Sequence, residues 1–117
     1  MNNYSYISHL ECPKCGEIYK GNHIYQLCKC GSPLLVRYDL EKVKENVSRE
    51  EIANRTNSLW RYHELLPIQQ QKNVVTLGEG MTPFEKLPSL GAEFGLNHLY
   101  IKDEGVIPTG SFKTRGA

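Results

Sequence analysis

Four cysteines near the N-terminus have the type and spacing of a metal site. They are Cys12, Cys15, Cys28 and Cys30, in the pattern C-x2-C-x12-C-x-C. Two short turns of this kind can hold four sulfur atoms in a tetrahedron about 2.3 Å from a zinc ion. Four thiolates fill the coordination shell, so the zinc would be structural and would not activate water. Two disulfides, or four unrelated thiols, are the alternative interpretations.

A lysine near the other end of the chain has the setting of a nucleophile. A turn at Pro108-Thr109-Gly110 leads into Ser111-Phe112-Lys113, and Ser111 is the expected N-cap of a helix. The partial positive charge of a helix start favours the neutral amine, which is the form that attacks an aldehyde. Most lysines near helix starts are surface residues, so the residues alone leave a plain surface lysine as the simpler interpretation.

The cysteines need a scaffold of short strands. The segment EIYKGNHIYQL predicts a strand, a turn at Gly21-Asn22 and a second strand, and PLLVRYD predicts a third. We therefore expect a zinc ribbon of three short strands over residues 8–40. So small a segment buries little apolar area, and metal binding would supply about 10 kcal/mol of apparent stability. His23, at the hairpin tip, is expected to be exposed and not to bind the metal.

Residues 41–75 are predicted to be a helical linker and docking segment. Asp39 is the expected N-cap of LEKVKENV, and Ser48 with Glu51 forms a capping box before the rest of EEIANR. The segment LWRYHELLP, with the only tryptophan, is expected to pack onto a larger body.

Residues 76–117 are predicted to begin an α/β domain. A Thr82-Pro83 step leads into a short strand at 84–86, PSLGAEFG predicts a helix that ends at Gly95, and NHLYIKD predicts a strand at 97–103. A loop and the helix start at Ser111 follow. The fold class is therefore α/β and incomplete, and we expect the two strands to lack partners within the chain.

Composition limits the partners. Hydrophobic residues make up 39% of the chain, and the net charge is +1 with both signs interspersed. These values predict no nucleic-acid or membrane partner. The first ten residues lack a basic region followed by an apolar core, and we expect a cytoplasmic protein, in which disulfides are rare.

The segment PTGSFKTRGA resembles the lysine motif of the pyridoxal-phosphate enzymes of the tryptophan-synthase-β fold type. In that family the lysine after Ser-Phe carries the cofactor, and the resemblance gives this role to Lys113. It also implies that Phe112 lies against the cofactor ring and that Ser111 and Thr109 lie near the substrate carboxylate. Arg115 could pair with a phosphate, but we expect a structural ion pair.

Three upstream features resemble one group within the family, the threonine synthases. These are the four-cysteine ribbon, LWRYHELLP followed by LGEGMTP, and LYIKDEGVIPTGSFK. The resemblance implies an enzyme that converts O-phosphohomoserine and water to threonine and phosphate, and a homodimer when complete. The chain has Ile107 and Thr114 where many relatives have asparagine and aspartate, which bears on the cofactor loop and on substrate preference.

In the family, the glycine-rich loop for the cofactor phosphate and the hydroxyl residue facing the pyridine nitrogen lie downstream of the lysine. We therefore expect an N-terminal fragment that is inactive alone. The alternatives are a sister enzyme, such as cysteate synthase or threonine dehydratase, and a stand-alone zinc-ribbon module. In that module the C-terminal third would be a vestige.

Overall fold

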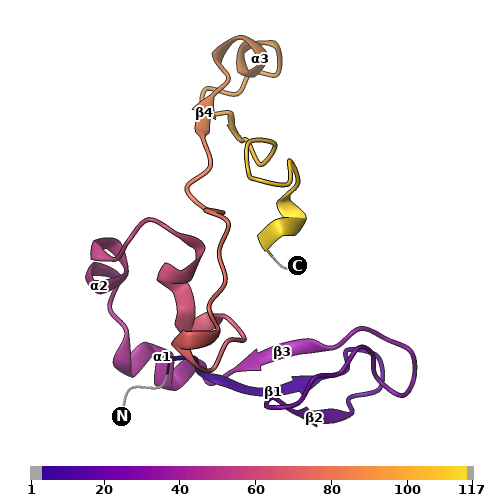
Figure 1. Cartoon of the computed structure of the whole chain (residues 1–117). Helices are drawn as coiled ribbons and strands as arrows, with labels where there is room; N and C mark the ends of the chain where they lie inside the picture. The colour runs from indigo at the N-terminus through magenta and orange to yellow at the C-terminus, as the bar shows by residue number, and fades with distance from the viewer. Residues whose placement is uncertain (1–3, 116–117) are drawn as a thin grey trace. The chain divides into compact units, whose positions relative to one another are not determined.

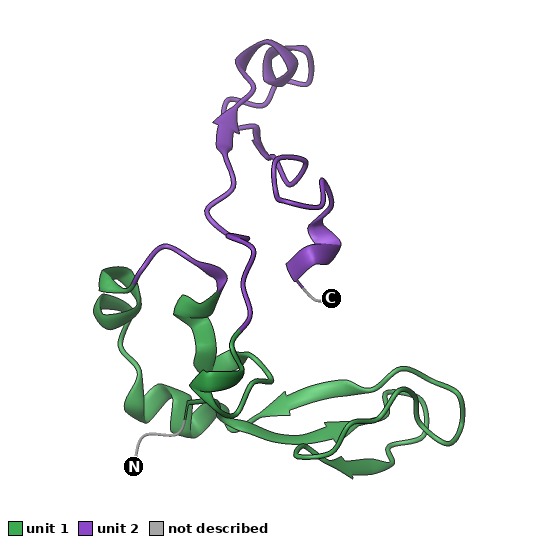
Figure 2. Cartoon of the chain, viewed as in Figure 1, with its two compact units in different colours: residues 1–55, 60–74 green, residues 56–59, 75–117 purple. Residues whose placement is uncertain are grey.

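The computed structural model describes residues 4–115. The chain divides into two compact units, one made of residues 1–55 and 60–74 and the other of residues 56–59 and 75–117 (Figure 2). Each unit has its own small sheet, so each is described by itself.

The first unit is built on a three-stranded antiparallel sheet (Figure 1). Its strands are β1 (Ile7–Glu11), β2 (Ile18–Lys20) and β3 (Leu35–Tyr38). The order is β2-β1-β3, so β1 is the central strand. Glu11 lies opposite Ile18 on one side and opposite Leu35 on the other. This register brings the end of β1, and with it Cys12, to the same end of the sheet as the loops that carry the other cysteines.

The predicted hairpin after Gly21-Asn22 is wrong. β2 pairs with β1, and the residues that follow the turn form no strand. The reason is that the first cysteine turn is itself the hairpin turn, because Cys12 N–H donates to Glu17 O at 3.0 Å. Ile24, expected in the second strand, is 99% exposed. The strand expected within PLLVRYD is confirmed as β3.

Two short helices follow the sheet, and both caps are confirmed. α1 (Leu40–Asn46) begins after Asp39, whose carboxylate accepts from Lys42 N–H at 3.1 Å. α2 (Arg49–Asn54) begins after Ser48, whose hydroxyl accepts from Glu51 N–H at 3.0 Å. These side chains satisfy N–H groups that the helices leave without an internal partner.

The segment LWRYHEL forms a 3₁₀ helix, η1 (Leu59–Leu65), and a shorter one, η2 (Gln71–Asn73), follows. η1 is held to α2 and to the N-terminal strand region by Glu64, which is buried. The Glu64 carboxylate pairs with Arg55 at 2.6 Å, and its backbone carbonyl accepts from Tyr6 N–H at 3.0 Å. Arg55 also holds Glu51 at 2.5 Å, which ties both ends of α2 into the same network.

The second unit contains β4 (Phe84–Lys86), α3 (Pro88–Glu93), β5 (Tyr100–Lys102) and a 3₁₀ turn, η3 (Phe112–Arg115). This is the predicted order of elements, with the second strand shorter than expected. The expectation that the strands lack partners is wrong, because β4 pairs with β5 in antiparallel register, Phe84 opposite Lys102. The rings of Phe84 and Tyr100 stack across this pair at 4.9 Å. Gly95, with a φ of 66°, ends α3 as predicted.

The buried apolar core is small among the described residues: Tyr6, Cys12, Cys28 and Ile107. Large apolar side chains of the second unit remain open to solvent, with Phe84 at 65%, Phe94 at 69% and Phe112 at 64% exposure. Within residues 4–115, no helix has the length and apolar content needed to cross a membrane.

Candidate functional site

The four cysteines come together in the first unit as the sequence predicts. Their sulfur atoms all lie within 4.8 Å of one another. Cys12 and Cys30 are 3.6 Å apart at Sγ, and Cys15 and Cys28 are 3.5 Å apart. Sulfur atoms about 2.3 Å from a central zinc ion would be separated by about 3.8 Å, so the cluster has the dimensions and donor set of a tetrahedral zinc–thiolate site.

Glycines shape the two turns that present the sulfurs. Gly16 and Gly31 have φ values of 75° and 82°, in the left-handed region that glycine adopts without steric cost. Gly16 N–H donates to Cys12 O at 3.0 Å, and Gly31 N–H donates to Cys28 O at 2.8 Å. Each turn is therefore closed by its own backbone, and the side chains at its ends face one another.

The thiols do not ionise alike. Burial opposes ionisation of Cys12, but backbone N–H donors at Cys15 and Lys14 outweigh it and lower its pKa to about 6. For Cys15, a backbone hydrogen bond at Glu17 lowers the pKa, but the neighbouring Cys12 and Cys28 sulfurs outweigh it and raise the value to about 12. Some thiols of the cluster therefore ionise readily and oppose ionisation of the others. A divalent cation would remove that conflict.

Tyr19 adds a contact that the sequence reasoning missed. Its hydroxyl donates to Cys28 Sγ at 3.3 Å and accepts from Lys29 N–H at 3.0 Å. The bond from Tyr19 is the largest cause of a lowered pKa at Cys28. A tyrosine alternating along a strand is an ordinary pattern, so only the folded turn reveals this role.

The predicted lysine site lies in the second unit, at η3. The Ser111 hydroxyl accepts from Lys113 N–H at 3.3 Å, and Ser111 O accepts from Thr114 N–H at 3.1 Å. The structure thus has the helical start that was predicted at Ser111, in the form of a 3₁₀ turn. Phe112 and Lys113 are both exposed. The expected continuation at residues 116–117 lies outside the described residues.

The loop before the lysine is fixed by Ile107 and Gly110. Ile107 is 5% exposed, and its carbonyl accepts from Gly110 N–H at 2.7 Å. Gly110 has a φ of 66°, which suits a tight turn at that point. The Thr109 hydroxyl lies against that of Thr114 and donates to Ser111 O at 3.3 Å. Thr109, Ser111 and Lys113 are therefore gathered in one turn.

Arg115 forms the structural ion pair that was expected. Its Nε and a terminal guanidinium nitrogen donate to the two Glu104 carboxylate oxygens at 2.6 and 3.0 Å. The Thr82 hydroxyl donates to the same carboxylate at 2.5 Å. Sequence reasoning named neither Glu104 nor Thr82 as site residues. They are 22 positions apart, and no local pattern marks a contact of that range.

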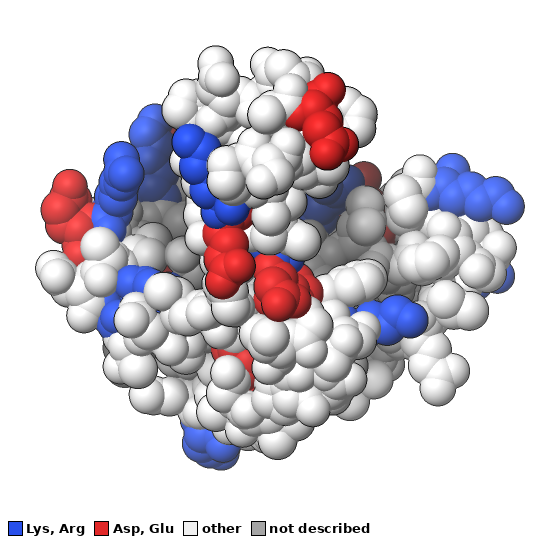
Figure 3. All heavy atoms as spheres, turned by 90° about the horizontal axis from the view of Figure 1, so that it is seen from above, with Lys and Arg blue, Asp and Glu red and all other residues white. Residues whose placement is uncertain are grey.

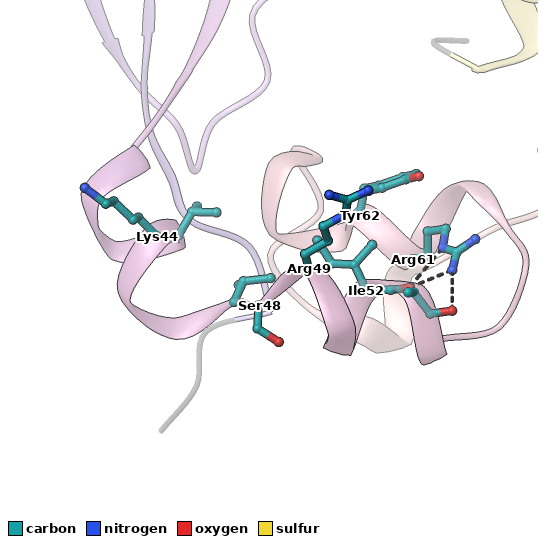
Figure 4. Close-up of a pocket in the computed structure, with 9 residues that line it drawn as sticks. Lys44, Ser48, Arg49, Ile52, Arg61 and Tyr62 are labelled. Carbon is teal, nitrogen blue, oxygen red and sulfur yellow. Dashed lines mark hydrogen bonds between the residues drawn. The ribbon is translucent and has the colours of Figure 1, made fainter.

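The first unit also has an open groove of about 580 Å³ between α1, α2 and η1 (Figure 4). Apolar side chains and three cationic residues line it: Val43, Lys44, Val47, Arg49, Ile52, Ala53, Arg61 and Tyr62, with Ser48. Arg61 donates to Ile52 O at 2.7 Å and Ala53 O at 2.9 Å, so its guanidinium closes the end of α2. Lysines and arginines also lie among acidic side chains on the molecular face in Figure 3. We assign no chemistry to the groove, because its lining has no carboxylate, thiol or imidazole.

Comparison with known families gives the class of protein to which this turn points. Residues 75–117 match the family model described as pyridoxal-phosphate dependent enzyme. The match covers the described part of the second unit from Val75 onward, including β4, β5 and the Lys113 turn. The lysine motif therefore lies in the kind of domain that the sequence resemblance predicted.

Among curated proteins, the chain is similar to threonine synthases. It is 44% identical over 105 residues to that of Methanocaldococcus jannaschii, which covers 90% of this chain and 26% of the relative. It is 39% identical over 109 residues to that of Methanosarcina acetivorans, which covers 92% of this chain and 26% of that relative. It is 47% identical over 64 residues to that of Halalkalibacterium halodurans, which covers 50% of this chain and 18% of that relative. No solved structure gave a significant match.

The resemblance to threonine synthases is thereby confirmed, and the chain is similar to a part of these enzymes. It spans about a quarter of the length of the first two relatives. The similarity to those relatives covers nine-tenths of the chain and therefore extends well beyond the family match that starts at residue 75.

Proposed function

We propose that this chain contributes the cofactor-carrying lysine and a structural zinc site to a threonine synthase, which converts O-phosphohomoserine and water to threonine and phosphate. The observation that carries the proposal is the similarity to threonine synthases over nine-tenths of the chain. Every curated relative named above is a threonine synthase. This favours that activity over cysteate synthase, threonine dehydratase or a stand-alone zinc module.

Lys113 would hold pyridoxal phosphate through its Nζ. The exposed side chain at the start of η3 leaves this amine open to a ligand, and the exposed Phe112 ring offers a flat apolar surface beside it. When bound, the cofactor supplies an electron sink for carbanion chemistry. Once the substrate amine has replaced it, Lys113 Nζ would take a proton from one substrate carbon and return it to another.

Ser111 and Thr109 would lie near the substrate carboxylate. In the structure the Ser111 hydroxyl already accepts from the backbone N–H of Lys113, and Thr109 is held against the same turn. The hydroxyls of Ser111 and Thr109 can donate hydrogen bonds, and a carboxylate offers only acceptors, so the two side chains suit such a group.

The four cysteines would hold zinc with a structural role. Four sulfur ligands leave no open position for water, so the metal would stabilise the first unit and take no part in the reaction. Cys12 and Cys28 are buried and Cys15 and Cys30 are exposed. The zinc would link the cysteine turns at one end of the three-stranded sheet.

The proposal is tested with the protein expressed from the complete reading frame that encodes these residues. Phosphate release from O-phosphohomoserine should depend on added pyridoxal phosphate. Lys113→Ala should lower it by at least about a thousandfold, because the proton-transferring amine is lost. Lys72→Ala, an exposed lysine of the first unit, is the matched control and should retain activity.

Release of phosphate at the wild-type rate by Lys113→Ala would contradict the assignment. Preference for phosphoserine with sulfite, or for free threonine, over O-phosphohomoserine would favour a sister enzyme. The 117-residue chain alone should release no phosphate above background, since it spans only about a quarter of the relatives.

A further inference from the structure

We propose that Glu104 is a positioning residue for Lys113 and that it acts through Arg115. The inference rests on the proposed function, because it assigns Lys113 as the residue to be positioned. Glu104, Arg115 and Thr82 together are called the clamp below.

The clamp connects three segments that are distant in the sequence. Thr82 precedes β4, Glu104 follows β5, and Arg115 lies in η3 two residues after the lysine. Both carboxylate oxygens of Glu104 are engaged. One accepts from Arg115 Nε at 2.6 Å, and the other accepts from the Thr82 hydroxyl at 2.5 Å and from Arg115 at 3.0 Å. A guanidinium and a carboxylate paired through two parallel bonds fix orientation as well as distance.

The clamp also rests on the sheet. Lys102, at the end of β5, donates through Nζ to Thr82 O at 2.5 Å. Asp103 N–H donates to Pro83 O at 3.0 Å and extends the β4–β5 pairing to the residues next to the clamp. Glu104 therefore follows directly after the paired end of β5.

The position of Arg115 constrains the lysine. Both belong to η3, in which Thr114 N–H donates to Ser111 O at 3.1 Å. A 3₁₀ turn has about three residues per turn, so a fixed guanidinium at one position limits the rotation of the whole turn. Phe112 and Lys113 are exposed, so their side chains make few packing contacts that could fix the turn. The ion pair is thus the main side-chain attachment of η3 to the sheet among the described residues.

The shielding of the pair supports a geometric role. The Arg115 side chain is 29% exposed and that of Glu104 is 24% exposed. Exposed ion pairs contribute little to stability, whereas partly buried ones with two parallel bonds hold geometry well. Arg115 directs two guanidinium nitrogens at Glu104, which favours this use of the residue over binding of a substrate phosphate.

The test uses the protein from the complete reading frame and four variants: Glu104→Gln, Arg115→Lys, the double variant of these two, and Glu104→Asp. Pyridoxal phosphate is added, borohydride fixes a pyridoxyl label on the lysine that carries it, and peptide mapping measures the label on Lys113 over time. We expect each single variant to lower the labelling rate and kcat about tenfold, because small misplacements of a reacting group are costly. KM should change much less than kcat.

The double variant should lose no more than the worse single variant, since both remove the same contact. Glu104→Asp, which keeps the charge, should recover part of the labelling rate. If Glu104→Gln kept the wild-type labelling rate and kcat, or if the losses added in the double variant, the proposed positioning role of the clamp would be wrong. A wild-type circular dichroism spectrum for each variant shows that the loss of labelling and kcat does not come from a loss of folding.

A second readout needs no cofactor. In the protein from the complete reading frame, without added pyridoxal phosphate, amide exchange at Thr114 should become at least about threefold faster in Glu104→Gln than in wild type, because the turn is released. An unchanged exchange rate at Thr114 would contradict the positioning role of the clamp even if Lys113 carries the pyridoxyl label. If the wild-type enzyme labels another lysine while exchange responds as expected, the proposed function fails and the clamp stands.

Discussion

At the scale of the residue, the chemistry of this chain depends on short contacts around a few side chains. Residue type and spacing were enough to predict that the four cysteines come together and that Ser111 caps a turn. The role of Lys113 came from the family resemblance and stays a prediction. The partners Tyr19, Glu104 and Thr82 could not be predicted. Tyr19 reaches Cys28 across a folded turn, and Thr82 reaches Glu104 only after β4 and β5 have paired.

Tyr19→Phe should weaken metal binding at the cysteine cluster. The Tyr19 hydroxyl donates to Cys28 Sγ at 3.3 Å and would disperse the charge of a zinc-bound thiolate. Loss of a contact of this kind typically lowers metal affinity by about tenfold or more. Competition with a chromophoric chelator measures the affinity, and Tyr25→Phe, in the neighbouring loop, is the control. Equal affinity in Tyr19→Phe and wild type would show that the contact has no such role.

Glu104 should give the second unit an acid-sensitive component of stability. The Arg115 guanidinium, followed by the Thr82 hydroxyl, lowers the pKa of Glu104 from its ordinary 4.5 to about 2. A carboxylate whose pKa is lower in the folded state stabilises the fold at any pH above its pKa in the unfolded state. This contribution is lost as the pH falls from about 4.5 through about 2.

Amide exchange in β4 and β5, measured from pH 5 to pH 2, tests this prediction. Glu104→Gln should be less protected than wild type at pH 5, and the difference should shrink toward pH 2. Glu93→Gln, an exposed carboxylate of α3, should follow the wild type throughout. A difference between Glu104→Gln and wild type that grows as the pH falls would contradict the assigned direction.

At the scale of the element, helix ends were predictable and strand partners were not. Asp39 and Ser48 cap α1 and α2 by accepting from an N–H group three positions further along the chain, a local contact that residue type and spacing predict. The pairing of β1 with β2 was missed because the first cysteine turn is also the hairpin turn. The β4–β5 pair was missed because the two strands were expected to lack partners within the chain, whereas α3 returns the chain so that they pair in antiparallel register.

Gly91→Ala should destabilise α3 although alanine is the better helix former. A Cβ added at residue 91 would lie 2.5 Å from Leu96 O, too close for any side chain. The added atom must also disturb the bond from Leu96 N–H to Gly91 O, now 2.8 Å. We expect a loss of about 1–3 kcal/mol, partly offset by up to about 1 kcal/mol of helix propensity.

Amide exchange at Leu96 and Leu99 measures the effect. Ser89→Ala places alanine at an exposed position of the same helix and should leave exchange unchanged or slower. If Gly91→Ala also slowed exchange, propensity would outweigh the contact, and the close approach of α3 to Leu96 would not constrain the fold.

At the scale of the whole molecule, the two units differ in what can stabilise them. The first has a three-stranded sheet, two capped helices and the cysteine cluster. The second has a two-stranded sheet and exposes Phe84, Phe94 and Phe112, and two strands alone are marginally stable in water. The clamp and the metal are therefore expected to matter more than the apolar core.

Zinc should order the first unit alone. In the 117-residue chain, one equivalent of zinc should slow amide exchange in β1, β2 and β3, while β4 and β5 stay weakly protected. Cys12→Ser should abolish the effect because it removes a buried ligand, and His23→Ala, at an exposed turn, should preserve it. Strong, equal protection of both units without metal would contradict this division of stability.

The identity of the lysine that carries pyridoxal phosphate is the most direct test of the function. The protein from the complete reading frame is incubated with the cofactor, reduced with borohydride and mapped by mass spectrometry. We predict a pyridoxyl label on Lys113, absent in Lys113→Ala and unchanged in Lys72→Ala. A label on another lysine, or no label in an enzyme that still releases phosphate from O-phosphohomoserine, would contradict the role of Lys113.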